Sequence, residues 1–308
     1  MNGSGIQYVM GVDAGGTRTR ARLAEAATGR TVGEGIGGPG NALSVPAEEL
    51  VRHLAEAVRG ALPRSPGAAA VRVAVVVGGF AGGGPGGGRA KALAALAGAL
   101  REAGVVPGAV EVRGDAEVAF ASGPGAPADG LVLIAGTGAA GARVRGRRMV
   151  AAADGDGWLL GDAGSGFWLG REALRAVLRA LDGRGPRTAL AGPVGELCGG
   201  LSKERVVRHA YGAHPVRLAE LSPVVVRVAE AGDGVAAGLL DRAADELTGT
   251  VRALGPVAGE PLVVTGGLLG PGGPLLGRLA ERVREWGLRP SPVRDGVGGA
   301  VALARLPR

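Results

Sequence analysis

A pattern of strand, glycine turn and strand occurs twice in this 308-residue chain and constrains its fold more than any other feature. In the first copy, a buried-strand candidate at Ile6–Val12 runs into a glycine turn and then into an alternating strand at Thr17–Leu23. In the second copy, Leu131–Ala135 and Ala142–Arg145 flank another glycine turn. Because apolar runs and polar–apolar alternation are typical of strands, each copy predicts a β-hairpin that begins its own sheet.

Helical segments follow both hairpins. In the first half, the spacing of apolar residues predicts helices at Pro46–Leu62 and Arg89–Ala103. In the second half, we expect helices at 167–181, 203–211, 218–231, 235–254, 275–286 and 297–306, and a strand at 262–265. A cluster of Gly and Pro marks a boundary between two domains of ordinary size, 1–122 and 123–308. The expected fold class is α/β, with two duplicated domains and a ligand cleft between them.

Composition excludes several classes of protein. The 61 glycines have no period of three, and 46% of residues are apolar, which argues against collagen-like structure and against disorder. The net charge is +7, but no aromatic residues interleave with the densest basic run at 143–148, so nucleic acid is not an expected partner. The single cysteine, Cys198, excludes an internal disulfide. Without a long apolar run or a signal peptide, we expect a cytoplasmic protein that does not bind a membrane.

The first glycine turn could hold an anion. Gly15 and Gly16 lack Cβ atoms, so backbone N–H groups can approach a phosphate, and Thr17 adds a hydroxyl donor. Asp13, at the end of the strand, is placed to hold a water-shelled Mg²⁺, which typically keeps one or two carboxylate ligands. An ordinary type I′ hairpin turn explains the same residues, and this turn alone does not decide between the two interpretations.

The second turn matches the dinucleotide-binding pattern G-x-G-x-x-G over residues 136–141. That pattern functions when a helix follows the turn, whereas here an alternating strand follows it. A Rossmann domain is therefore not expected. Neither turn carries the G-K-[ST] of a P-loop, which excludes that nucleotide site as well.

Two aspartates precede predicted helices. Asp115 follows the strand candidate Val110–Val112 and opens a helix, and Asp162 lies between Gly161 and Ala163 just before another. From the residues alone, an N-cap role is the better interpretation of Asp115, because Asp is favoured there and contributes about 1 kcal/mol. A base for a hydroxyl proton is the alternative.

Three blocks together carry a resemblance to a known family. Residues 11–19 read Gly-Val-Asp-Ala-Gly-Gly-Thr-Arg-Thr, residues 155–166 read Gly-Asp-Gly-Trp-Leu-Leu-Gly-Asp-Ala-Gly-Ser-Gly, and Gly266–Gly267 follow a late strand. This set resembles the BadF/BadG/BcrA/BcrD ATPase family, in its N-acetylglucosamine kinase-like branch. That family belongs to the superfamily of sugar kinases, heat-shock chaperone ATPases and actin. The resemblance implies two ribonuclease H-like domains with a nucleotide and substrate cleft between them, and ATP and Mg²⁺ as cofactors.

The resemblance also implies roles for individual residues. Asp115 would be the catalytic base and contact the sugar, together with Asn41, Gly155, Asp156 and Asp162. The residues implied on the nucleotide side are Asp13 (through Mg²⁺), Gly15, Gly16, Thr17, Gly136, Thr137, Gly138, Ser222, Gly266 and Gly267. Without the resemblance, Asn41 is better explained as a loop residue capping a turn, and Ser222 as the start of a Ser-Pro helix.

The chain departs from the family pattern at two positions. Ala163 stands where the central block usually has an acid, and Asp156 stands where N-acetylglucosamine kinases commonly have Trp. An additional carboxylate near the nitrogen substituent of the sugar would suit an amine better than an acetamide. Glucosamine is therefore expected to compete with N-acetylglucosamine as the substrate.

The resemblance implies an ATP-dependent sugar kinase that phosphorylates an amino sugar at the 6-hydroxyl. One alternative is an ATP-driven activator of the BadF type, but such proteins share an iron–sulfur cluster through more than one cysteine per chain, and this chain has only Cys198. Another is a kinase-derived sugar sensor, which would carry a helix-turn-helix before the first strand. The expected partners are a small-molecule sugar and ATP, and a homodimer is an option.

Overall fold

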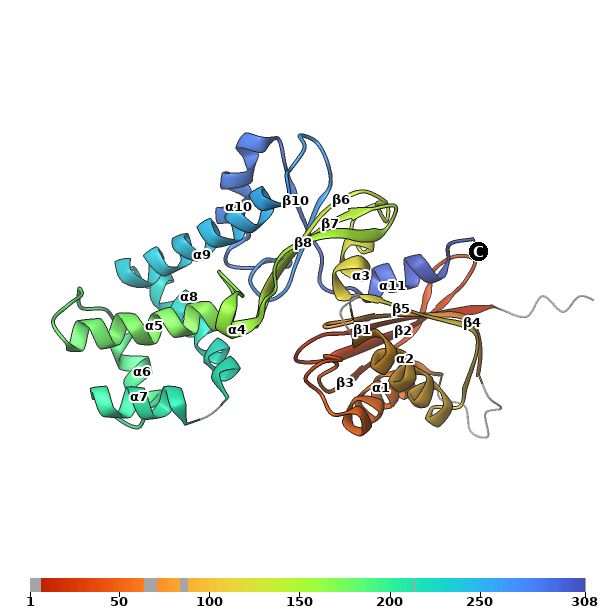
Figure 1. The fold of residues 1–308 in the computed structure, drawn as a ribbon, viewed down its shortest axis with the longest axis horizontal. Coiled ribbons are helices and arrows are strands. Elements are labelled where there is room, and N and C mark those ends of the chain that lie inside the picture. The colour runs from red at the N-terminus through yellow and green to blue at the C-terminus, as the bar shows by residue number, and fades with distance from the viewer. Residues whose placement is uncertain (1–6, 64–70, 84–87, 213, 308) are drawn as a thin grey trace, which may run out of the picture. The chain divides into compact units, whose positions relative to one another are not determined.

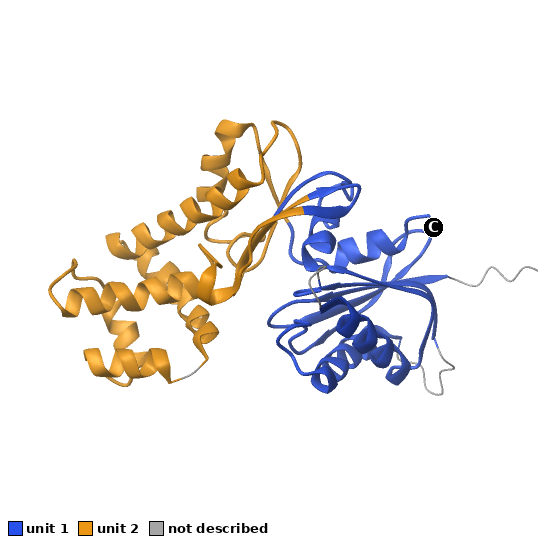
Figure 2. Cartoon of the chain, viewed as in Figure 1, with its two compact units in different colours: residues 1–132, 144–150, 293–308 blue, residues 133–143, 151–292 orange. Residues whose placement is uncertain are grey.

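The protein is described by a computed structural model covering residues 7–63, 71–83, 88–212 and 214–307 (Figure 1). The start of the first expected strand, at Ile6, lies outside the described residues. The chain divides into two compact units that interleave in sequence (Figure 2): unit 1 is Met1–Val132, Val144–Val150 and Val293–Arg308, and unit 2 is Leu133–Arg143 and Ala151–Pro292. The division into domains 1–122 and 123–308 stays a prediction.

The sheet of unit 1 has the strand order β3-β2-β1-β4-β5. Its strands are β1 (Tyr8–Ala14), β2 (Thr19–Glu25), β3 (Thr31–Gly37), β4 (Val71–Phe80) and β5 (Val105–Gly114). β1 pairs antiparallel with β2, which sets Asp13 opposite Arg20. β4 runs parallel to both β1 and β5, and Phe80 is in register with Ala14 on one side and Gly114 on the other. The carboxyl ends of β1, β4 and β5 therefore meet at one edge.

Helices cover both faces of this sheet (Figure 1). On one face lie α1 (Ala47–Ala61) and α2 (Gly88–Glu102), and on the other lie α3 (Asp115–Ala121) and α11 (Val297–Ala304). Gly11 lets α11 approach β1 closely, because a Cβ there would lie 2.7 Å from the carbonyl oxygen of Val297. The last helix of the chain is thus part of the core that the first strand begins.

The second sheet repeats the topology of the first. Its order is β10-β9-β6-β7-β8, and reading it from β8 gives third, second, first, fourth and fifth strand along the chain, as in unit 1. The strands are β6 (Gly130–Ala135), β7 (Ala139–Arg145), β8 (Arg148–Asp154), β9 (Leu262–Thr265) and β10 (Pro290–Pro292). The expected duplication of an α/β unit is confirmed.

Unit 2 contains most of the helices. They are α4 (Gly157–Leu160), α5 (Gly166–Leu181), α6 (Ala191–Leu197), α7 (Lys203–Tyr211), the 3₁₀-helix η1 (Pro215–Leu221), α8 (Ser222–Glu230), α9 (Gly234–Ala253), α10 (Leu276–Val283) and the 3₁₀-helix η2 (Arg284–Trp286). α5 packs against η1, α8 and α9. α8 and α9 also pack against each other, and α10 packs against α9. The helix expected at 218–231 is divided at Ser222, where Pro223 lets a 3₁₀-helix end and an α-helix begin.

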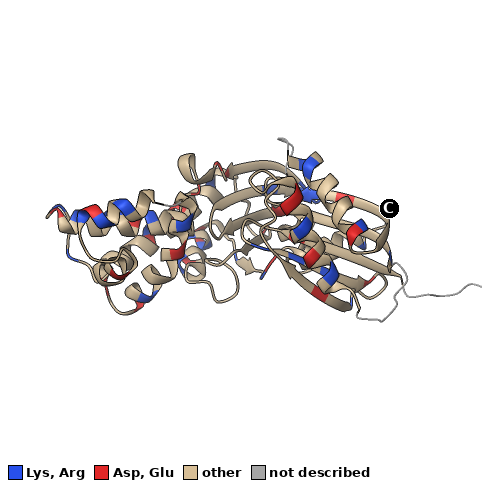
Figure 3. Ribbon diagram, turned by 90° about the horizontal axis from the view of Figure 1, so that it is seen from below, with Lys and Arg blue, Asp and Glu red and all other residues tan. Residues whose placement is uncertain are grey.

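Charged residues of both signs are interspersed along the helices (Figure 3). Many of them pair locally, as Arg278 does with Asp241 at 2.9 Å and Arg282 with Asp245 at 2.7 Å. Among the helices that the structure describes, none is long and apolar enough to cross a membrane.

Candidate functional site

Two aspartates meet at the edge of the unit 1 sheet where parallel strands end. Asp13 is the next-to-last residue of β1, and Asp115 follows the last residue of β5. β4 lies between these strands and is in register with both. The carboxyl ends of parallel strands are where such sheets usually place ligand-binding groups.

Asp13 is partly buried, and its pKa rises from 3.8 to about 6. Burial is the main cause, and the charges of Asp115 and Asp295 add to it. The N–H of Gly296 donates to Asp13 Oδ2 at 2.8 Å and opposes the shift, as the guanidinium of Arg20 also does. The carboxylate of Asp13 thus accepts a hydrogen bond that stabilises its ionised form, although its burial and the neighbouring acids disfavour the negative charge.

Asp115 is the first residue of α3 rather than its N-cap, which is Gly114. The capping role falls to Glu117, whose Oε2 accepts the N–H of Gly114 at 3.2 Å. The N-cap expectation for Asp115 is therefore wrong. Its Oδ1 accepts the neighbouring N–H of Ala116 at 2.9 Å, and burial raises the pKa of the carboxyl. The groups that oppose this rise are backbone N–H donors and not cations.

Asp295 is a third acid at this edge that sequence reasoning missed. Its Oδ2 lies 3.4 Å from Nε of Arg20, and its Oδ1 accepts the N–H of Val297 at 3.2 Å at the start of α11. An Asp-Gly pair directly before a Gly- and Ala-rich helix was the available signal. Within the described ranges, no group of three or more His, Cys, Asp or Glu side chains is placed to hold a metal ion.

The first glycine turn adjoins this edge. The N–H of Gly15 donates to the carbonyl of Arg18 at 3.0 Å, and neither Gly15 nor Gly16 has the positive φ that a type I′ turn requires. The type I′ interpretation is therefore wrong. Gly16 and Thr17 are exposed, and nothing lies within 4 Å of a Cβ built on Gly16. The N–H of Gly15 is occupied within the turn, whereas the exposed residues leave room for a ligand.

Asn41 lies close to the same strand ends. Its Oδ1 accepts the N–H groups of Leu43 at 2.9 Å and Ser44 at 3.2 Å, which is the turn-capping role that the residues alone suggested. The next residue, Ala42, donates to Ala81, and Ala81 donates to Ala14 at the end of β1. This ladder brings the Asn41 loop beside the aspartate edge.

In unit 2, the second glycine turn is joined to the start of α5. The N–H groups of Gly166 and Phe167 donate to the carbonyls of Gly136 at 2.8 Å and Thr137 at 3.1 Å. Strand β7 follows this turn, as expected, so the rejection of a Rossmann domain is confirmed. Gly138 has no room for a side chain, because a Cβ would lie 2.6 Å from Oδ1 of Asp162.

Asp162 stabilises the second glycine turn by a hydrogen bond. Its Oδ1 accepts the N–H of Ala139 at 2.9 Å, and its backbone has a φ of 55°. Burial raises the pKa of this carboxyl, and the charges of Asp154 and Asp156 raise it further. The loop itself is held by Asp154, which sequence reasoning missed: its carboxylate accepts the N–H groups of Gly155, Asp162 and Ala163 at 2.7–2.8 Å.

The late glycine pair lies beside the second turn. The N–H of Leu268 donates to the carbonyl of Ala135 at 3.0 Å, and a Cβ on Gly136 would be 4.0 Å from both Gly266 and Gly267. Ser222 belongs to the same group, since its Oγ would lie 3.3 Å from a Cβ on Gly166. Unit 2 therefore brings all of its expected nucleotide-side residues together.

Gly155 and Asp156 lie at the outer part of the loop after β8. Both are exposed, and Asp156 precedes α4 without capping it through its side chain. Gly155 has a φ of 83° and would crowd Ala140 if it carried a Cβ. Two large apolar side chains follow on α4, where Leu159 and Leu160 are exposed.

Two sheets of the same order, each with a glycine turn after its first strand and acids at strand ends, define the actin-like ATPase class. The sequence profile of the BadF/BadG/BcrA/BcrD ATPase family matches residues 10–304, and the chain belongs to this family.

Individual relatives narrow the comparison. The N-acetylmuramic acid/N-acetylglucosamine kinase of Clostridium acetobutylicum is 30% identical over 81% of this chain and 79% of its own. The glucosamine kinase GspK of Vibrio cholerae is 28% identical over 58% of each chain. A solved structure from Chromobacterium violaceum, named provisionally as an N-acetylglucosamine kinase, is 28% identical with a TM-score of 0.75, covering 97% of this chain and 99% of that one. The actin-like, sugar-kinase type of fold is confirmed.

Proposed function

We propose that this chain is an ATP-dependent sugar kinase that transfers a phosphoryl group to the 6-hydroxyl of an amino sugar. Family membership and the sugar kinases among its relatives support the class of reaction. The observation that carries the proposal is Asp115, a partly buried carboxyl at the end of β5 that does not cap its helix and that accepts hydrogen bonds from backbone N–H groups.

Asp115 is the proposed base. Burial raises its pKa towards the working pH, and a base is most effective when its pKa lies near that pH. The carboxylate takes the proton of the attacking hydroxyl as the oxygen bonds to the γ-phosphorus, and the bond from that phosphorus to the β–γ bridging oxygen breaks so that ADP leaves. Asn41, Gly155, Asp156 and Asp162 are proposed to contact the sugar.

The nucleotide is proposed to bind the glycine turns of both units. Backbone N–H groups and the hydroxyls of Thr17 and Thr137 would hold its phosphates, because donors aimed at phosphate oxygens stabilise the charge of the transferred group. Ser222, Gly266 and Gly267 would lie on the adenosine side. A crowded glycine such as Gly266, whose Cβ would be 2.2 Å from the Ala135 carbonyl, admits no other residue.

Mg²⁺ is proposed to be held by Asp13 through water. A single carboxylate fits a cation that keeps most of its water and takes its remaining ligands from nucleotide phosphates. When bound, it would neutralise charge on the phosphates. The N–H of Gly296 holds the Asp13 carboxylate by a hydrogen bond, and the positive charge of Arg20, which pairs with Asp295, stabilises its ionised form.

The preferred sugar is proposed to be glucosamine or N-acetylglucosamine. Asp156, exposed on the loop, is the group that would favour a cationic amine. A cytoplasmic location and a homodimer stay predictions, as does the absence of nucleic-acid and membrane partners.

A substrate panel tests the proposal. ATP consumption is measured with glucosamine, N-acetylglucosamine, glucose and no sugar, and phosphorus NMR identifies the phosphorylated position. An amino sugar should stimulate ATP consumption most and yield a 6-phosphate. Equal ATP consumption without sugar would contradict it and favour an activator ATPase.

The Asp115→Asn variant tests the base. Without the carboxylate, kcat should fall by about 10²–10⁴ because no group accepts the hydroxyl proton, while sugar binding measured by calorimetry should change only a few-fold. A variant that retains full turnover and binds sugar normally would exclude Asp115 as the base.

A further inference from the structure

A cavity of about 970 Å³ in unit 2 is lined by charged residues of α5, α9 and the loop between α5 and α6. Its volume lies at the upper end of the range for small-molecule sites, about 300–1,000 Å³. The charged residues of its lining are Arg175, Arg179, Arg187, Arg242 and Glu172. Four guanidinium groups against one carboxylate leave an excess of three positive charges on its walls.

The one carboxylate is already shared. Glu172 is buried, and its oxygens lie 3.0 Å from Arg175, 3.7 Å from Arg242 and 3.2 Å from Arg171, which is outside the lining. A single negative charge divided among three arginines cannot neutralise the cavity. The side chains of Arg175 and Arg242 are 65% and 57% exposed, so water weakens the repulsion between them, and an anion bound there would meet an excess of positive charge.

The arginines keep free donors. Among the described residues, Arg187 has no side-chain hydrogen bond or ion pair, and Arg179 donates only to the carbonyl of Arg184, at 3.1 Å. The guanidinium of Arg242 lies over the ring of Trp168, 5.5 Å from its centre, which is a cation–π contact. Planar guanidinium groups with free N–H pairs match the oxygens of a phosphate in a bidentate manner.

The lining also has an apolar part. Ala176, Val235 and Leu239 contribute carbon surface between the arginines, which suits a carbon skeleton better than a bare ion. Within unit 2 the cavity is separate from the second glycine turn. At about 1.5 Å per residue, Arg175 and Arg179 lie roughly 14 and 20 Å along α5 from Gly166, which bonds to that turn.

We propose that this arginine-lined cavity binds a small organic phosphate, of the size of a hexose monophosphate, at a site separate from the proposed kinase site. The guanidinium groups of Arg187 and Arg242 hold the phosphate, and the apolar residues contact its carbon skeleton. Such a site would let a phosphorylated metabolite influence the enzyme without occupying the glycine turns.

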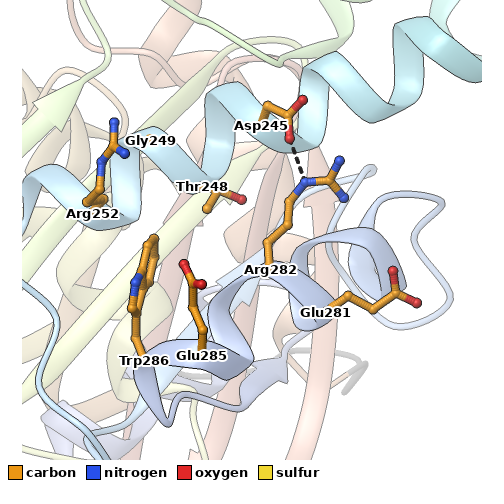
Figure 4. A pocket seen from close by; sticks show the side chains of 8 residues that line it. All are labelled: Asp245, Thr248, Gly249, Arg252, Glu281, Arg282, Glu285 and Trp286. Atoms are coloured by element: carbon orange, nitrogen blue, oxygen red, sulfur yellow. Dashed lines mark hydrogen bonds and ion pairs between the residues drawn. The ribbon is translucent and has the colours of Figure 1, made fainter.

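A second cavity in the same unit provides a matched control (Figure 4). It measures about 450 Å³ and lies between α9 and the α10–η2 segment. Its lining has no excess of positive charge, because the three carboxylates of Asp245, Glu281 and Glu285 outnumber the two guanidinium groups of Arg252 and Arg282, and Arg282 bonds to Asp245 at 2.7 Å. Arg252→Gln therefore removes one positive charge from α9, the helix that also carries Arg242, without touching the arginine-lined cavity.

Calorimetry with glucose 6-phosphate and with inorganic phosphate tests the proposal on the full chain. Glucose 6-phosphate should bind the wild-type protein more tightly than inorganic phosphate. The double variant Arg187→Gln/Arg242→Gln should weaken this binding by roughly tenfold or more, because it removes two charged donors, whereas Arg252→Gln should leave it unchanged. Circular dichroism establishes that each variant is folded.

Four results would overturn the proposal. Glucose 6-phosphate could fail to bind, or could bind the double variant as tightly as the wild type, which would place it at another site. If Arg252→Gln weakened the binding of glucose 6-phosphate as much as the double variant does, the overall charge of the protein and not this cavity would explain the binding. If inorganic phosphate bound as tightly as glucose 6-phosphate, the carbon skeleton would contribute nothing to binding, and the cavity would not be a site for an organic phosphate. None of these results depends on kinase activity, so the proposal and the proposed function can fail independently.

Discussion

At the scale of single residues, the ionised carboxylate of Asp13 lowers the stability of the folded protein, and its neighbours only partly offset this loss. Its pKa of about 6 in the folded protein exceeds the ordinary 3.8, so the folded state binds the proton more tightly and its ionised form is destabilised. This cost is absent below pH 3.8, grows between pH 3.8 and 6, and is complete above pH 6. A shift of about two units corresponds to about 2–3 kcal/mol.

Asp13→Asn should therefore raise the free energy of unfolding by about 2–3 kcal/mol at pH 8, with a gain that shrinks towards pH 4, while kinase activity is lost. Urea unfolding at both pH values measures this. Glu56→Gln, which removes an exposed carboxyl from α1, should show no such pH dependence. A loss of stability at pH 8 would contradict the prediction.

Asp156 belongs to the residue scale as well. If its charge favours an amine, Asp156→Ala and Asp156→Asn should both lower the ratio of kcat/KM for glucosamine to that for N-acetylglucosamine. The expected change is about two- to fivefold, the effect of an exposed ion pair. Kinetics on both sugars measure the ratio, and equal turnover that neither substitution alters would exclude the role.

At the scale of elements, the contact between α3 and α11 depends on Gly299. A Cβ there would lie 2.0 Å from the carbonyl of Val118 and 2.5 Å from the nitrogen of Ser122, so any side chain must separate the helices. Gly299→Ala should lower the free energy of unfolding by about 1–3 kcal/mol. Gly249→Ala on α9, with nothing within 4 Å, should be neutral or stabilising by about 0.5–1 kcal/mol. Thermal unfolding compares the two, and equal effects would contradict the argument.

Sequence periodicity predicted the elements that bury a regular apolar face. The strand at Leu262–Thr265 and the helix at Lys203–Tyr211 have the expected bounds. It missed α4, α6 and β10, which are four, seven and three residues long, because so few residues show no period and such elements are decided by tertiary contacts. Local pattern likewise favoured Asp115 as a cap, whereas Glu117 two residues later takes that role.

At the scale of the whole molecule, the candidate acids could be located from the sequence because strand ends share an edge. The groups that bond to these acids could not be located from the sequence. Asp13 accepts from Gly296, 283 residues further along the chain, and Arg20 meets Asp295 over a similar separation. Contacts of this kind follow from topology and not from neighbouring residues, so no local pattern indicates them.

The return of the last residues to unit 1 has a consequence for how the protein is made. A chain leaving the ribosome exposes β1 long before α11, and the face of the sheet that α11 covers includes Val9 and Val77. Until residues 296–304 have emerged, only α3 can cover that face, and Asp13 lacks the N–H of Gly296. Unit 1 therefore completes its folding only after the residues of unit 2 have been synthesised, so a nascent chain cannot assemble the aspartate edge early.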